Sequence, residues 1–249
     1  MIYKLTAQLE LPQELQTNNL GSTLHGVLME LLPTEIVKQL HSASAYSPLR
    51  QRLIIKRGSK PRWEIVSLSS ELGKILMNCL MDRTSILLKH HQIEVAIGNI
   101  SVEKIDETAL IKDCFSQQVS PRYIKLAIQT PIAFKSKGEY EIFPDLQKFF
   151  RSIMLTFDSF FEDYELYDSE TLTYILENVK IVDYRMRSTR FHLEGVRIPS
   201  FTGELKFRIS GPQPMQQLIH LIIQFGELSG VGIKTSLGMG KYTLVEPNN

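Results

Sequence analysis

Histidine is the residue type in this sequence whose side chain is best suited to moving protons near neutral pH. An imidazole with an unperturbed pKa of about 6.5 serves as a general base or as a general acid. Two-metal hydrolysis needs clustered carboxylates instead, and no compelling acidic cluster lies beside the histidine-containing segments. The residues therefore favour acid–base chemistry with no metal and no other cofactor. The histidines are His25, His41, His90, His91, His192 and His220.

Positive charge is concentrated in two stretches of a chain whose formal net charge is only +1. Residues 50–62 hold six Lys or Arg and no acid, and a second basic stretch spans residues 185–197. The local field, rather than the net charge, steers a polyanion to a surface. A pair of solvated strands or loops explains the same pattern without any ligand. The cations in question are Arg50, Arg52, Lys56, Arg185, Arg187, Arg190 and Arg197.

Four glycines lie close together in residues 230–240, after an amphipathic segment and before the last strand-like segment. Glycines at this spacing let the backbone approach another chain or a phosphate, and successive N–H groups then form a cavity for an anion. A loop that only packs the last strand explains the spacing equally well. The residues of this candidate phosphate site are Gly230, Gly232, Gly238 and Gly240, with Lys234 and Lys241 nearby.

Hydrophobic periodicity divides the chain into two halves with the same order of elements. In the first half it predicts strands at 2–10, 50–56, 62–68 and 85–103, and helices at 21–42 and 70–81. In the second half it predicts strands at 123–130, 173–186, 190–210 and 240–246, and helices at 144–161 and 213–228. Two βαββαβ units predict an α+β protein with two tandem ferredoxin-like, RRM-like domains. We expect the domains to span residues 1–117 and 118–249.

Composition narrows the class of protein. Apolar residues make up 43% of the 249 and charged residues 22%, which is a globular balance. The sequence shows no apolar run long enough to span a membrane and no signal peptide. Two cysteines are too few for a disulfide framework or a cysteine-rich zinc site. We therefore expect a cytoplasmic protein with no membrane partner.

Several segments together resemble one family. GVGIKTSLGMGKYTLVE, at residues 230–246, resembles the C-terminal glycine-rich loop of the RAMP proteins. Three further segments, LHGVLMELL at 24–32, KLAIQTPIAFKSKGEYEIFPD at 125–145 and FTGELKFRISGP at 201–212, are similar in order and spacing to the Cas-six family of CRISPR repeat endoribonucleases. The resemblance covers nearly the whole chain.

This resemblance implies a reaction and a partner. The family cuts CRISPR precursor RNA within its repeats to generate crRNA. A ribose 2′-OH attacks the adjacent phosphorus, which leaves a 2′,3′-cyclic phosphate and a 5′-OH. Because the nucleophile belongs to the RNA, the protein supplies in-line geometry, a base, an acid and neutralisation of the phosphate.

The resemblance also points to site residues. The family places its catalytic histidine just after the first helical segment, where this chain has His41. Its first helix often carries a tyrosine, but the corresponding face here offers Met29, which leaves His25 as the substitute. Tyr46 is a further candidate from the loop that follows. The expected RNA-binding residues are Arg50, Arg52, Lys56, Arg185, Arg187, Arg190, Gly230, Gly232, Lys234, Gly238, Gly240 and Lys241, with His192 beside them and His220 structural.

One alternative function remains open from the sequence. A non-catalytic RAMP subunit that holds crRNA in a CRISPR effector complex shares the glycine-rich loop but does not need both His25 and His41. Besides the repeat RNA, the partners left open are effector-complex subunits and a second copy of this chain.

Overall fold

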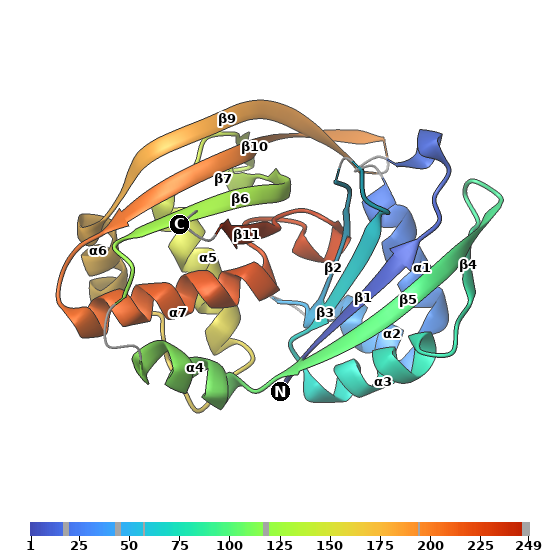
Figure 1. Ribbon diagram of the computed structural model, residues 1–249, viewed down its shortest axis with the longest axis horizontal. Coiled ribbons are helices and arrows are strands. Elements are labelled where there is room, and N and C mark those ends of the chain that lie inside the picture. The colour runs from blue at the N-terminus through green and yellow to red at the C-terminus, as the bar shows by residue number, and fades with distance from the viewer. Residues whose placement is uncertain (17–19, 43–45, 57, 117–119, 194, 246–249) are drawn as a thin grey trace.

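Two antiparallel sheets, each covered by helices on one face, make up the protein (Figure 1). The computed structural model describes residues 1–16, 20–42, 46–56, 58–116, 120–193 and 195–245. The expected domain boundary after residue 117 lies outside these ranges.

The first unit contains a sheet with the strand order β2-β3-β1-β5-β4, in which every neighbouring pair is antiparallel. Helices α1, α2 and α3 bury their apolar side chains against one face of this sheet. The elements are β1 (Ile2–Leu9), η1 (Gln13–Leu15), α1 (Gly21–Leu31), α2 (Thr34–Ser42), β2 (Leu49–Ile54), β3 (Arg62–Ser67), α3 (Ser70–Leu80), β4 (Ser85–Leu88) and β5 (Ile93–Ile105).

The second unit contains a sheet with the strand order β11-β6-β10-β9 and a small separate hairpin of β7 and β8. Helix α4 (Glu107–Ser116) precedes it, and α5, α6 and α7 cover one face of its sheet. The elements are β6 (Tyr123–Ile132), β7 (Phe134–Ser136), β8 (Glu139–Glu141), α5 (Leu146–Asp158), α6 (Ser169–Asn178), β9 (Val179–Leu193), β10 (Val196–Ile209), α7 (Gln213–Ser229), η3 (Thr235–Leu237) and β11 (Tyr242–Val245).

Both sheets repeat one topology, which confirms the predicted α+β fold. Within each βαββαβ unit the fourth strand pairs with the first, the first with the third, and the third with the second. This order reads β5-β1-β3-β2 in the first unit and β11-β6-β10-β9 in the second, and the first sheet adds β4 at one edge. Two ferredoxin-like units therefore follow one another along the chain.

The prediction of a strand over residues 173–186 was wrong in its first part, because residues 173–178 form the end of α6. The carboxylate of Asp168 accepts hydrogen bonds from the amides of Glu170 and Thr171 and so caps the start of this helix. Leu172 and Ile175, one turn apart, are buried on its inner side. The cap and the packing together outweigh the β-branched residues of the segment.

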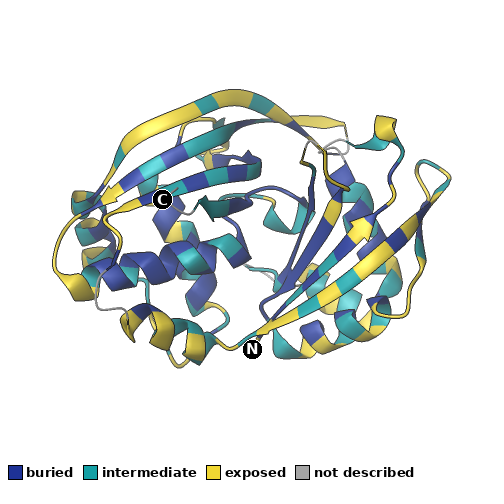
Figure 2. Ribbon diagram, viewed as in Figure 1, coloured by how far each residue is buried: buried dark blue, intermediate teal, exposed yellow. Residues whose placement is uncertain are grey.

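Strand β2 is buried along its whole length because it is covered on both faces. Leu49 and Leu53 pack with the helices of the first unit. Arg50 and Arg52, which alternate with them, point toward the second unit, where they contact the end of α7. Figure 2 shows this buried strand between the two units and the exposed residues along β9. None of the helices in the described ranges is long and apolar enough to span a membrane.

Two helical glycines give a matched test of this architecture. A Cβ at Gly73 in α3 would lie 2.4 Å from ring atoms of buried Tyr3 in β1, whereas one at Gly26 in α1 would meet nothing within 4 Å. We expect Gly73→Ala to lower the free energy of unfolding by about 1–3 kcal/mol, because overpacking outweighs the better helix propensity. Gly26→Ala should leave it unchanged or raise it by up to about 1 kcal/mol. Thermal unfolding of both variants measures the difference, and a stabilised Gly73→Ala protein would contradict the α3–β1 contact.

Candidate functional site

The glycine-rich loop runs from the end of α7 to β11 and is tied to its own unit by backbone hydrogen bonds. The amide of Ile233 donates to the carbonyl of Ala133 at 3.1 Å, and the amide of Gly240 donates to the carbonyl of Pro131 at 2.9 Å. A Cβ at Gly232 would lie 2.4 Å from the Ala133 oxygen, so glycine is required where the loop passes the end of β6. The φ of Gly232 is +80°, which also favours glycine.

The tip of this loop packs on the first unit. A Cβ at Gly21, the first residue of α1, would lie 2.1 Å from the carbonyl oxygen of Leu237. The Gln51 side chain in β2 donates to the carbonyls of Gly21 and Ser236, at 2.8 and 3.2 Å. Trp63 in turn donates its indole N–H to the Gln51 amide oxygen at 3.0 Å. The loop, the start of α1 and β2 are therefore held together as one assembly.

The expectation that the glycine amides bind phosphate is corrected for three of the four glycines. The amide of Gly230 donates to Gly226 at 2.9 Å, that of Gly240 to Pro131 at 2.9 Å, and that of Gly232 to the Ser152 hydroxyl at 3.4 Å. Because these N–H groups already have acceptors inside the protein, they are not available to an anion. The glycines serve close packing instead, which was the alternative interpretation of their spacing.

Gly238 and Lys234 remain candidates on the same loop. Gly238 is buried with a φ of +108°, and a Cβ there would lie 3.2 Å from the Cα of Gly21. Lys234 has a φ of +56° and an exposed side chain at the start of η3. Lys234 is therefore the loop cation that the fold leaves accessible to RNA.

Of the three predicted catalytic residues, His25 and His41 lie on helices that pack against the first sheet, and Tyr46 lies just before β2. His25 is half-buried in α1, one turn beyond the residue on which the glycine-rich loop packs. His41 is exposed in the last turn of α2. Tyr46 is half-buried before β2, and residues 43–45 between them lie outside the described ranges. Both helices pack into the same core of the first unit, and the catalytic roles of the three side chains stay predictions.

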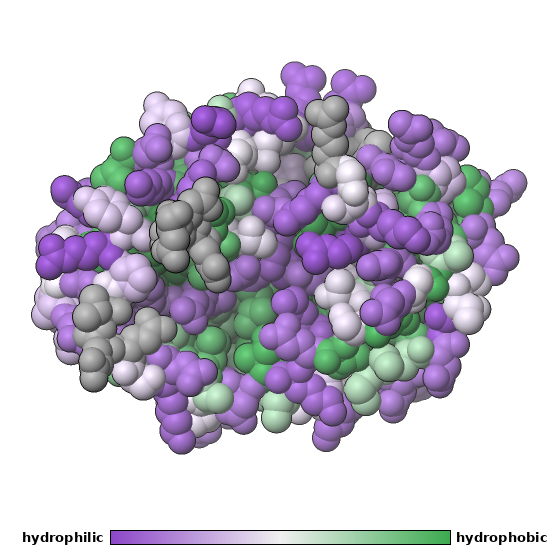
Figure 3. Space-filling view, viewed as in Figure 1, coloured by the Kyte–Doolittle hydropathy of each residue, from purple (hydrophilic) through white to green (hydrophobic). Residues whose placement is uncertain are grey.

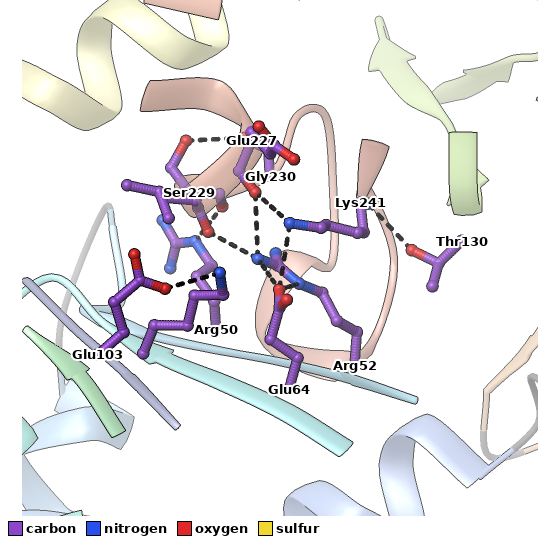
Figure 4. A network of polar contacts seen from close by, with 11 residues as sticks. Arg50, Arg52, Glu64, Glu103, Thr130, Glu227, Ser229, Gly230 and Lys241 are labelled. Atoms are coloured by element: carbon purple, nitrogen blue, oxygen red, sulfur yellow. Dashed lines mark hydrogen bonds and ion pairs between the residues drawn. The ribbon is translucent and has the colours of Figure 1, made fainter. Parts of the chain in front are cut away.

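A buried polar network joins the two units at the end of α7 (Figure 4). Arg52 and Glu64 face each other on β2 and β3, and the Arg52 Nε donates to Glu64 Oε1 at 2.6 Å. The Arg52 Nη2 donates to the carbonyl of Leu228 at 2.8 Å. Lys241 lies 3.2 Å from the same Glu64 oxygen and donates to the carbonyl of Glu227 at 2.7 Å.

Arg50 completes this network by donating from Nε to the carbonyl of Ser229 at 2.7 Å. Three cations thus meet the last carbonyls of α7, the negative end of the helix dipole. Burial lowers the pKa of Arg50 to about 9, with the charge of Arg52 acting in the same direction. Burial also lowers the pKa of Lys241 to about 8, again assisted by Arg52 and opposed by Glu64. We call this group of Arg50, Arg52, Glu64 and Lys241 with the end of α7 the α7 joint.

The prediction that Arg50, Arg52 and Lys241 bind RNA is corrected by their burial. Their exposed fractions are 3%, 0% and 2%, and Arg50 Nε, Arg52 Nε and Nη2, and Lys241 Nζ donate to acceptors within the α7 joint. A guanidinium with no exposed surface has no contact with a solvated phosphate. These cations hold the two units together instead.

The other predicted cations are exposed. Lys56 follows β2, and Arg185, Arg187 and Arg190 lie along β9 with their side chains at the surface. Arg190 and the exposed His192 line a surface hollow of about 510 Å³ beside β8. These residues remain candidates for RNA contacts.

His220 in α7 has the structural role that was expected. It is only 7% exposed, and its Nε2 lies 2.8 Å from the carbonyl oxygen of Pro121. Burial lowers its pKa. Within the described ranges, no three His, Cys, Asp or Glu side chains gather where they could hold a metal ion.

Sequence reasoning missed Glu64 and Gln51, the two side chains that organise this region. Glu64 is a single acid shortly after the basic stretch of residues 50–62, and only the strand register places it opposite Arg52. Gln51 alternates with the arginines and therefore faces the helices. The alternation of Gln51 with the two arginines along β2 was the available signal in the sequence. It does not show which side chains are buried, because the burial of the arginines depends on the second unit covering the strand.

Glu64 should be the most sensitive residue of the α7 joint. We expect Glu64→Gln to lower the free energy of unfolding by about 3 kcal/mol, because removal of the acid leaves buried cations without their partner. Glu10→Gln is the matched control, since Glu10 pairs with Lys60 at an exposed position and should contribute less than about 1 kcal/mol. Urea unfolding measures both. Equal effects of the two substitutions would contradict the central role of Glu64.

The same carboxyl predicts a dependence of stability on pH. Burial would raise the pKa of Glu64, but the charges of Arg52 and Lys241 and the hydrogen bond from Arg52 lower it to about 2. Its folded pKa lies below the ordinary value of 4.5, so its stabilisation is complete above about pH 4.5 and is lost as the pH falls toward about 2. Between about pH 5 and pH 3, wild-type protein should lose more stability than Glu64→Gln. If the free energy of unfolding fell equally steeply with pH in both proteins over this range, the lowered pKa of Glu64 would be contradicted.

Comparisons with known proteins agree with one another. A family described as CRISPR-associated endoribonuclease Cas6 matches residues 126–242. A CRISPR-associated endoribonuclease Cas6 of Streptococcus thermophilus is 30% identical over 236 residues, which cover 92% of each protein. A solved Cas6 product complex has a TM-score of 0.79 at 17% identity and covers 98% of this chain and 100% of that one. A Cas6 substrate mimic complex has a TM-score of 0.75 at 16% identity and covers 98% and 99%.

The structural likeness shows the same tandem ferredoxin-like fold. The sequence likeness extends over 92% of both proteins, and the family match at residues 126–242 includes the glycine-rich loop. This chain therefore belongs to the Cas6 family of CRISPR-associated endoribonucleases.

Proposed function

We propose that this protein cleaves CRISPR precursor RNA within its repeats and generates crRNA without a metal ion. Support comes from the relatives, which are named as endoribonucleases, and from structural neighbours described as product and substrate mimic complexes. The observation that carries the proposal for this chain is the docking of the glycine-rich loop on α1. It sets a loop with the exposed Lys234 against the helix that carries His25, beside the helix that carries the exposed His41.

The proposed reaction is an internal transesterification of the RNA. A base removes the proton of the ribose 2′-OH, and the 2′-oxygen forms a bond to the adjacent phosphorus. The bond from phosphorus to the 5′-oxygen breaks, and an acid protonates that oxygen. The products are a 2′,3′-cyclic phosphate and a 5′-OH, so no water and no external nucleophile enter this step.

His41 and His25 are the side chains that we assign to the two proton transfers, with Tyr46 as a further candidate. A positioned acid or base contributes about 100-fold to 10,000-fold to the rate. The exposed cations Lys56 and Lys234 would neutralise the reacting phosphate, while the arginines of β9 would hold the flanking RNA. Arg50 and Arg52 would not contact the RNA. They would contribute indirectly, because the α7 joint to which they belong positions the glycine-rich loop.

The alternative function, a non-catalytic subunit that holds crRNA in an effector complex, would use the same loop and the same cations. It predicts RNA binding without dependence of any rate on histidine. The cytoplasmic location predicted from the sequence belongs to the main proposal, because precursor RNA is transcribed there in a bacterium or archaeon.

Chelation and a modified substrate test the reaction type. Cleavage of a cognate repeat RNA should proceed in EDTA at an unchanged rate, since protein side chains and the RNA's own 2′-OH suffice. A single 2′-deoxy substitution immediately 5′ of the cut should abolish the product, because the nucleophile is missing. Gel analysis of product ends checks both. Loss of activity in EDTA, or cleavage of the deoxy substrate, would overturn the proposed mechanism.

Histidine variants test the assignment of the side chains. His41→Ala should lower the single-turnover rate by about 100-fold or more, with RNA affinity nearly unchanged. His25→Ala should act in the same direction. His90→Ala is the matched control, because His90 is an exposed histidine in the turn after β4 and should keep full activity. Unchanged cleavage by the His25→Ala, His41→Ala double variant would favour the non-catalytic subunit instead.

A further inference from the structure

The second sheet has one face that helices do not cover in the described part of the chain. Its inner face buries Ile124, Leu126 and Ile128 of β6 against α5 and α7. Side chains of a strand alternate between faces, so the residues between them point outward. Tyr123, with an exposed fraction of 55%, and half-buried Lys125 therefore belong to the outer face.

The strand registers arrange this outer face in rows. Arg208 of β10 pairs with Tyr123 on one side and with Lys180 of β9 on the other. In the next row Lys206 pairs with Lys125 and with Asp183. The rows beyond place Glu204 opposite Arg185, and Thr202 opposite Arg187. We call the residues of these rows the outer sheet face.

Positive charge dominates the outer sheet face. Its only acids are Asp183 and Glu204, and the Glu204 carboxylate lies 2.9 Å from the Lys125 ammonium. The Lys206 ammonium lies 5.2 Å from the centre of the Tyr123 ring, a position that orients the aromatic ring among cations. The cations are Lys125, Lys180, Arg185, Arg187, Lys206 and Arg208. An alternating display of cations with an exposed ring fits a phosphate chain with accessible bases.

Strand β9 connects this face to the candidate active site. A Cβ at Gly21, the start of α1, would lie 3.0 Å from the ring of Phe191 near the end of β9. From Lys180 to Phe191 the strand covers roughly 36 Å at about 3.3 Å per residue. Its exposed Arg185 and Arg187 lie along this path, whereas Arg190 pairs with Pro199 and projects on the opposite face. Hydrophilic side chains gather at the rim of the molecule over β9 (Figure 3).

We propose that the outer sheet face binds single-stranded RNA that continues from the repeat, with one base stacked on Tyr123. This inference rests on the proposed function. The cations along β9 and β10 contact the phosphates, and the ring of Tyr123 supplies a platform that accepts any base, because every base has a π-face. A duplex fits this face less well, since its bases are stacked and paired and present no free face to the tyrosine.

The experiment measures affinity for non-cleavable RNA of two lengths. The repeat carries a 2′-deoxy substitution at the cut and is compared with the same repeat extended by about ten unstructured nucleotides on the 5′ or the 3′ side, a length within the range of single-strand sites. Wild-type protein should bind one extended RNA at least about 5-fold more tightly than the bare repeat. A complementary strand that makes the extension double-stranded should remove most of this gain.

Two tyrosines of the same sheet provide the variant and its control. Tyr123→Ala should weaken binding of the extended RNA by about 5-fold or more and leave binding of the bare repeat within about 2-fold. Tyr184→Ala should change neither, because Tyr184 pairs with the buried Leu205 and so projects on the opposite face although it is 61% exposed. Lys206→Ala should reduce the slope of the logarithm of the binding constant for the extended RNA against the logarithm of the salt concentration by about one unit.

Three results would overturn this inference. In the first, neither the 5′ nor the 3′ extension increases the affinity of the wild-type protein. In the second, Tyr123→Ala and Tyr184→Ala lose equal affinity for the extended RNA. In the third, the gain in affinity persists when the extension is double-stranded. Cleavage of the unmodified bare repeat is measured on the same proteins. A wild-type protein that cleaves the bare repeat but gains nothing from an extension refutes the outer sheet face alone, whereas absence of cleavage refutes the proposed function.

Discussion

The negative end of α7 and the three cations that meet it hold the two units in one arrangement. The carbonyls of Glu227, Leu228 and Ser229 accept hydrogen bonds from side chains of β2 and from Lys241. A helix end buried without such donors would leave its last carbonyls unsatisfied. Because the glycine-rich loop follows α7 directly, the same hydrogen bonds determine where that loop reaches α1. The candidate active site therefore depends on a contact that includes none of its own proposed catalytic residues.

The composition of the α7 joint explains why one carboxylate is so important. Three buried cations repel one another, and Glu64 is the acid that lies within 4 Å of two of them. Burial of an ion pair is expensive by itself, so the joint does not stabilise the fold through its charges alone. Its contribution is geometric, since Arg50 Nε, Arg52 Nε and Nη2, and Lys241 Nζ each have a carbonyl or carboxylate at hydrogen-bond distance, although the buried Arg52 Nη1 has no acceptor.

Cations along the chain consequently divide into two classes that look alike in sequence. Those of β2 face the second unit and are buried, whereas those of β9 and β10 face solvent on the outer sheet face. Both sets lie on the strand face opposite to the one that packs against the helices of their own unit. The difference arises because a second layer covers one sheet face and not the other.

The sequence by itself determined the repeated βαββαβ order, the tandem ferredoxin-like fold and the family, because hydrophobic periodicity and the glycine-rich segment are local along the chain. It also identified the exposed arginines of β9 and the histidines on α1 and α2 as candidates. It missed α4, α6 and the hairpin of β7 and β8. It could not separate Arg50, Arg52 and Lys241 from cations at the surface, or show that the amides of Gly230, Gly232 and Gly240 are already occupied. Glu64 opposite Arg52, and Tyr123 beside Arg208, become neighbours only through strand register. Burial and hydrogen-bond partners depend on residues far apart in the chain, so only the tertiary structure decides them.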